Sequence, residues 1–147
     1  MLLNIAIGAL LVLLTTAIHA EGMLFLLHMK RMQERDLHHY PRRKKIYLVG
    51  LVIILLLLVS VAEMALWAVA YLKIGAIEGM EAALYFSMVT FTTLGYGDIT
   101  LSEQWRLLAS FEAATGIIMF GWTIGLVVAT VQRVYFSEKR NDSQSHN

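Results

Sequence analysis

Three apolar blocks dominate the chain, and each is long enough to cross a lipid bilayer. They cover residues 1–29, 46–72 and 105–134. A membrane-spanning helix needs about 20 apolar residues, so a longer block crosses with some tilt or with its ends in the headgroups. The composition agrees, because only 16% of the residues are charged, against about 25% in soluble domains. The sequence therefore predicts an all-α membrane protein with three transmembrane helices.

The first block could instead be a cleavable signal peptide. No basic stretch precedes its apolar run, and Ile18-His19-Ala20 is a poor cleavage site. The apolar run also resumes at Met23. We therefore expect residues 1–29 to be a retained transmembrane helix.

The basic residues predict how the chain is oriented in the membrane. Seven of the twelve Lys and Arg residues lie in the linker 30–45, and three (Arg133, Lys139 and Arg140) lie at or beyond the end of the third block. The positive-inside rule puts the linker and the C-terminus in the cytoplasm and the N-terminus outside the plasma (inner) membrane. The linker is a topology signal that can also bind anionic lipid headgroups. The hydrophilic tail 135–147 is predicted to be disordered.

The segment between the second and third blocks is too polar and too rich in glycine to span the membrane. Residues 81–92 predict a short helix, since Glu81 in its first turn suits the helix dipole. The sequence Thr-Leu-Gly-Tyr-Gly-Asp follows at 93–98. A pore must replace the hydration shell of an ion with closely spaced oxygens, and backbone carbonyls serve if they point one way. Glycines at alternate positions permit such a backbone.

This segment closely resembles the selectivity filter of potassium channels, whose usual form is Thr-Val-Gly-Tyr-Gly. Leu94 replaces the valine, but the contacting atom there is the carbonyl oxygen. Residues 105–131 are similar to the inner helix of two-helix channels. The resemblance covers about 46–133, so the first helix is an addition to the two-helix plan.

The resemblance implies a pore domain over residues 46–134. Its parts are an outer helix at 46–72, a re-entrant pore helix at 81–92, the filter at 93–98 and an inner helix at 105–134. Potassium ions are expected at the carbonyls of Thr93, Leu94, Gly95 and Tyr96 and at the Thr93 hydroxyl, with Gly97 completing the filter and Asp98 at the outer mouth. One pore loop per chain cannot enclose an ion, so four copies would assemble as a homotetramer.

Six other residues are candidates for support of the filter, for gating or for pH sensitivity. Glu63 and Glu112 are acids inside predicted spans, where acids are expensive and mark functional sites. Counted from the outer helix ends, both lie at similar depth, so we expect at least one to be protonated or bonded to the pore helix and to support the filter together with Thr92. Gly116 is a gating hinge or a close packing point. His19 and Glu21 form a pH-sensitive contact or are polar residues at headgroup level.

Other functions remain open on the sequence alone. A weakly selective cation channel and a non-conducting regulatory subunit of another channel are the alternatives to a potassium channel. An ion-uptake transporter would need four pore loops, usually in one longer chain. The chain has no cysteine, which excludes disulfides and thiolate sites, and no nucleophile-base pattern suggests an enzyme. We expect no cofactor other than potassium ions and no nucleic-acid partner.

Overall fold

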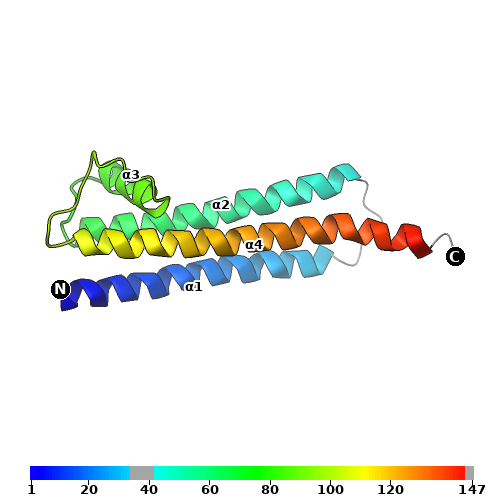
Figure 1. The fold of residues 1–147 in the computed structure, drawn as a ribbon, viewed down its shortest axis with the longest axis horizontal. Coiled ribbons are helices and arrows are strands. Elements are labelled where there is room, and N and C mark those ends of the chain that lie inside the picture. The colour runs from blue at the N-terminus through cyan, green and yellow to red at the C-terminus, as the bar shows by residue number, and fades with distance from the viewer. Residues whose placement is uncertain (34–41, 145–147) are drawn as a thin grey trace.

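The computed structural model describes residues 1–33 and 42–144, where the regular elements are four helices. They are α1 (Leu2–Gln33), α2 (Arg42–Lys73), α3 (Met80–Phe91) and α4 (Arg106–Gln144). The three long helices lie side by side, with the short α3 at one end (Figure 1). Segments Leu2–His28, Ile46–Lys73 and Arg106–Gln132 are each apolar and long enough to cross a membrane. The predicted fold class, all-α with three spans, is confirmed.

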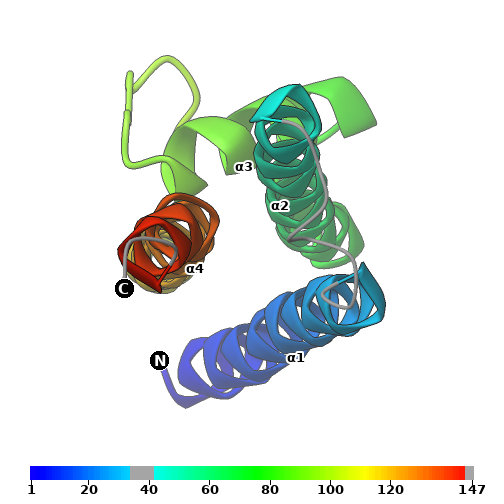
Figure 2. The ribbon, with the colours of Figure 1, turned by 90° about the vertical axis from the view of Figure 1, so that its right-hand side faces the viewer.

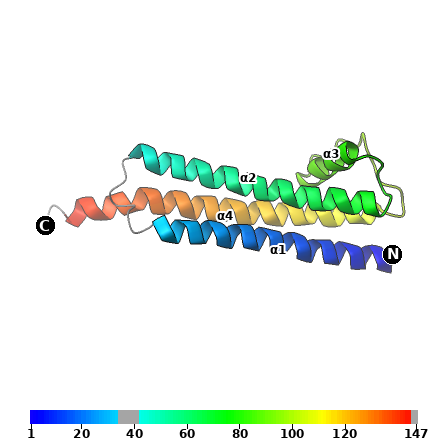
Figure 3. The same cartoon turned by 180° about the vertical axis from the view of Figure 1, so that it is seen from behind.

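The helix directions bring the N-terminus and the pore loop to the same end of the molecule. α2 runs opposite to α1 and α4, and the C-terminus lies at the other end (Figures 1 and 3). Seen end-on, α3 lies on one side of the α2–α4 pair and α1 lies on the opposite side (Figure 2). α1 therefore supports the pair from behind, away from the pore loop.

Helix boundaries differ from the sequence prediction at both ends of the linker and in the tail. α1 continues through 30–33 and α2 begins at Arg42, so the described parts of the predicted linker 30–45 are helical, while 34–41 lie outside the described residues. α4 continues through 135–144, where a disordered tail is predicted, and 145–147 lie outside the described residues. The sequence contains no glycine or proline after Gly125. A helix that has already formed therefore extends at the gain of one hydrogen bond per residue.

The core lies mainly at the end that carries α3. Its fully buried large side chains include Trp67 and Tyr71 of α2, Phe91 of α3 and Leu108 of α4, and Leu11 of α1 belongs to the same cluster. A smaller cluster of Leu26, Val52, Leu56 and Leu126 holds the other end together. Many other apolar side chains of the long helices face outward. That pattern suits lipid or partner contact on the outside of the bundle.

α1 packs on the other helices through one narrow stripe. Its buried residues are spaced by three or four positions along most of the helix, as expected for a single helical face. The stripe consists of Asn4, Gly8, Leu11, Thr15, His19 and Leu26. Three of these six residues have polar side chains, which is unusual for a helix in a membrane. The contacts of these three are described below.

Candidate functional site: the pore loop and its buried support

The backbone after α3 alternates in the sign of φ. Thr93, Gly95 and Gly97 have positive φ angles of 62°, 55° and 79°, and the residues between them do not. In a pleated strand successive carbonyls point to opposite sides, whereas alternating left-handed residues turn successive peptide groups toward one side. Glycine adopts this conformation freely. A β-branched residue does so at a cost of about 1–3 kcal/mol, which marks Thr93 as a strained position.

The start of the loop is bound to the last turn of α3. The backbone N–H of Thr93 donates to the Thr90 carbonyl at 2.9 Å, and the N–H of Leu94 donates to the Val89 carbonyl at 2.9 Å. Thr92, the last residue before the loop, ends the helix and donates its hydroxyl to the Met88 carbonyl at 2.6 Å. The partial negative charge of the α3 C-terminus therefore lies next to the predicted filter residues.

The far end of the loop is bound back to the middle of α3. The Tyr85 hydroxyl donates to Asp98 Oδ2 at 2.7 Å. This hydrogen bond holds the pKa of Asp98 below its usual value. Both residues are exposed, so the bond adds little stability, and its effect is mainly on the geometry of the loop.

Glu112 connects three helices beside the loop. Its side chain is fully buried. Oε2 accepts from the Tyr71 hydroxyl of α2 at 2.7 Å, and Oε1 lies 2.5 Å from Ser87 Oγ of α3. Ser87 Oγ also lies 2.7 Å from the carbonyl oxygen of Met64 in α2. The structure thus places this acid of α4 directly against the pore helix.

Glu63, the other acid within a span, faces α1. Its Oε1 is 2.8 Å from His19 Nδ1, and both side chains are buried. The contacts of Glu112 extend along α2 from Tyr71 to Met64, the residue next to Glu63, because Ser87 bonds to both Glu112 and the Met64 carbonyl. Of the two acids, Glu112 bonds to α3 and Glu63 bonds to α1.

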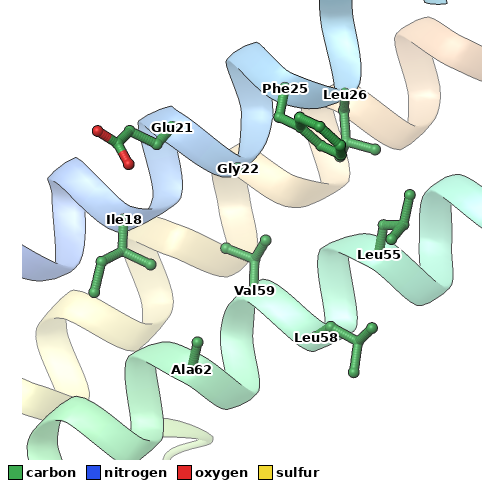
Figure 4. Close-up of a pocket in the computed structure, with 9 residues that line it drawn as sticks. All are labelled: Ile18, Glu21, Gly22, Phe25, Leu26, Leu55, Leu58, Val59 and Ala62. Carbon is green, nitrogen blue, oxygen red and sulfur yellow. The ribbon is translucent and has the colours of Figure 1, made fainter. Parts of the chain in front are cut away.

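His19 bonds to Glu63 and not to Glu21, which is exposed. A groove of about 440 Å³ runs between α1 and α2 at this height, lined mainly by apolar side chains such as Ile18, Phe25 and Leu58. Figure 4 shows the Glu21 carboxylate at the edge of this groove, pointing away from α2. A contact between His19 and Glu21 is therefore absent.

Gly116 packs against the backbone of α3. A Cβ atom at this position would stand 2.0 Å from the Phe91 carbonyl oxygen. By contrast, a Cβ at Gly121 or Gly125 would meet no atom of the described chain within 4 Å. Of the two roles considered for Gly116, close packing therefore has a direct structural reason.

The polar residues of the α1 stripe contact the rest of the chain at three positions along α1. The Asn4 side-chain amide donates to the backbone carbonyl of Gln104, just before α4. The Trp67 indole N–H donates to Thr15 Oγ1 at 3.1 Å. The His19 ring lies 5.2 Å from the Trp122 ring of α4 and contacts Glu63 of α2.

Sequence reasoning missed these contacts, together with the roles of Tyr71, Tyr85 and Ser87. The spacing of Glu63, Trp67 and Tyr71 at four-residue intervals was an available signal of one polar face on α2.

A family model described as "ion channel" matches residues 53–133, more than half of the chain. The match includes most of α2, all of α3, the loop and α4 up to residue 133. It leaves out α1. No solved structure matches the chain.

Proposed function

Because the chain belongs to the pore-loop ion channel family, we propose that it conducts potassium ions selectively through residues 93–98. The observation that carries this proposal is the alternating positive φ at Thr93, Gly95 and Gly97. Two of these positions are glycines, and the third is a threonine held in a strained conformation. Such strain persists only where the surroundings enforce it, which is typical of functional sites.

The ion contacts follow from the chemistry of dehydration. An ion that leaves water loses solvation worth tens of kcal/mol, which oxygens of the pore must replace. We propose that the carbonyls of Thr93, Leu94, Gly95 and Tyr96 and the Thr93 hydroxyl supply them. The C-terminus of α3 favours a cation nearby through its dipole. Asp98 adds a carboxylate at the outer mouth.

One loop supplies only one wall of a pore, so we propose a homotetramer around the filter axis. The exposure of the loop supports this proposal, because Leu94 and Tyr96 are 58% and 67% exposed in the single chain. Large apolar side chains at such a position are expected to be covered by a neighbouring copy.

We propose that the protein lies in the plasma membrane with the basic linker 30–45 and the C-terminus on the cytoplasmic side. The distribution of Lys and Arg residues supports this orientation. The N-terminus and the pore loop would then face outward. Their location at one end of the molecule is consistent with this orientation (Figure 1). Anionic lipids at the linker are an expected partner.

The test is flux from the purified protein in liposomes under potassium and then sodium gradients. We expect strong preference for potassium, and block by barium. Gly95→Ala places a side chain at φ +55°, which costs about 1–2 kcal/mol and should abolish the preference. Gly121→Ala, where a Cβ meets nothing within 4 Å, is the matched control and should keep it.

Two results would overturn the proposal in different ways. Equal potassium and sodium flux would identify a weakly selective cation channel. An intact tetramer without flux under any of the gradients would favour a regulatory subunit or a closed gate over an open potassium channel.

A further inference from the structure

The three hydrogen bonds around Glu112 and Ser87 require three protons, and only two are available if Glu112 is ionised. Ser87 Oγ lies within hydrogen-bond distance of two oxygens, the Met64 carbonyl at 2.7 Å and Glu112 Oε1 at 2.5 Å. A serine hydroxyl has one proton to donate, and a backbone carbonyl can only accept. If Glu112 is ionised, its oxygens also only accept. Two short contacts would then share one proton.

A protonated Glu112 satisfies every contact. Tyr71 donates to Oε2, the acid proton on Oε1 donates to Ser87 Oγ, and the Ser87 proton goes to the Met64 carbonyl. Each oxygen then has a partner, and each proton is used once. The chain of bonds links α2, α4, α3 and α2 again. Buried polar groups in native proteins are normally satisfied in this way.

We infer that Glu112 is a proton-binding site: as a neutral acid it fastens the inner helix α4 to the pore helix α3. This inference deepens the proposed function and rests on it, because it assigns a form of regulation to the same filter. Glu112 is a positioning residue, since it acts on the filter through Ser87 and α3.

Among the described residues, no charged group bonds to Glu112 that would stabilise an anion. Its side chain is fully buried, and within the described chain its polar partners are the hydroxyls of Tyr71 and Ser87. A buried carboxylate without a cation is strongly disfavoured. The other titratable groups on the helices packed around Glu112 have partners of their own or are exposed. Glu63 on α2 pairs with His19 of α1, and Tyr85 on α3 bonds to Asp98. Glu81 and Lys73 are exposed, and Arg106 on α4 lies near Glu103.

Loss of the proton changes the contacts in a defined direction. At alkaline pH Oε1 becomes an acceptor, so the Ser87 hydroxyl turns to it and leaves the Met64 carbonyl. The bond between α3 and α2 is then lost, and a negative charge appears next to the pore helix in every subunit. The intact arrangement is present at neutral and acidic pH and is lost as the pH rises.

Infrared spectroscopy of the protein in vesicles tests the proton directly, without any need for conduction. The wild type at neutral pH should show a protonated-carboxyl C=O band that is absent in Glu112→Gln. In Ser87→Ala the band should remain but move to higher frequency, because the acid proton loses its acceptor. A spectrum in which Glu112→Gln removes no such band would overturn the inference.

The pH profile of flux tests the consequence. The glutamine amide has a carbonyl oxygen that can accept from Tyr71 and an NH₂ group that can donate to Ser87, so Glu112→Gln can reproduce the chain of bonds and should keep potassium selectivity at neutral pH. The selectivity of the wild type should fall about tenfold toward alkaline pH, the change equivalent to one hydrogen bond of about 1.4 kcal/mol, while that of Glu112→Gln stays constant.

Two flux results contradict the inference, and a third concerns only the proposed function. Loss of selectivity in Glu112→Gln at neutral pH, or the same alkaline fall in both proteins, would overturn the role of the proton. Absence of potassium selectivity in the wild type at every pH would instead overturn the proposed function, and the infrared result would still decide whether Glu112 holds a proton.

Discussion

Replacing Gly116 with alanine should displace the pore helix, and the size of the effect follows from the structure. The new Cβ would stand 2.0 Å from the Phe91 carbonyl oxygen. An ordinary carbon–oxygen contact is about 3.3 Å, so α4 and the end of α3 must separate by about 1.3 Å. The Phe91 side chain is fully buried and contacts Phe120 edge-on at 5.7 Å, which leaves little room to adjust. Overpacking of this kind costs about 1–3 kcal/mol.

Two measurements on purified Gly116→Ala separate packing from a hinge. We expect lower thermal stability and reduced potassium-over-sodium selectivity, because Phe91 lies two residues before Thr93 and a shift there reaches the filter. Gly121→Ala on the same helix, with no atom near the new Cβ, should behave like the wild type. If Gly116→Ala keeps full stability and selectivity and lowers only the rate of flux, the packing argument is wrong and the hinge is favoured.

Three further changes test other contacts of the site. Tyr85→Phe removes the bond that lowers the pKa of Asp98. The pKa of Asp98 should therefore rise toward its usual value, and the Asp98 carboxylate at the outer mouth should become neutral at a higher pH than in the wild type as the solution is acidified; potassium flux that falls at the same acid pH in both proteins would contradict this. His19→Leu or Glu63→Leu alone leaves a buried partner unpaired and should cost about 3–5 kcal/mol in unfolding free energy, whereas the double variant should recover much of it; additive losses would show that the pair is not coupled. Trp67→Phe removes the 3.1 Å bond to Thr15 and should lower the unfolding free energy by about 0.5–1.5 kcal/mol, while potassium selectivity stays unchanged because this bond joins α2 to α1 and not to α3.

The three spans and the short helix before the loop could be predicted from the sequence because their signals are local. The length of each apolar block predicts a span, and the flanking glycines together with an acidic first turn predict α3. The contacts of Glu112 could be predicted only in part. An acid in a span needs a partner, but Ser87 and Tyr71 are ordinary residues until α2, α3 and α4 are packed together. The role of Gly116 was equally open, because only the position of the Phe91 carbonyl distinguishes a packing point from a hinge.

The sequence of α1 contains a pattern that predicts contact with the other helices, and the resemblance to two-helix channels does not include α1. Asn4, Thr15 and His19 lie on one helical face, and polar residues in a membrane helix are expensive unless they face protein. That face predicts docking against the pore unit. The partners in the structure show why docking matters, since Glu63 lies within the family match, is fully buried and has one polar partner, His19, in the described chain. A pore unit of α2, α3 and α4 alone would leave this acid unpaired. The smallest unit in which Glu63 keeps this partner therefore contains all three long helices.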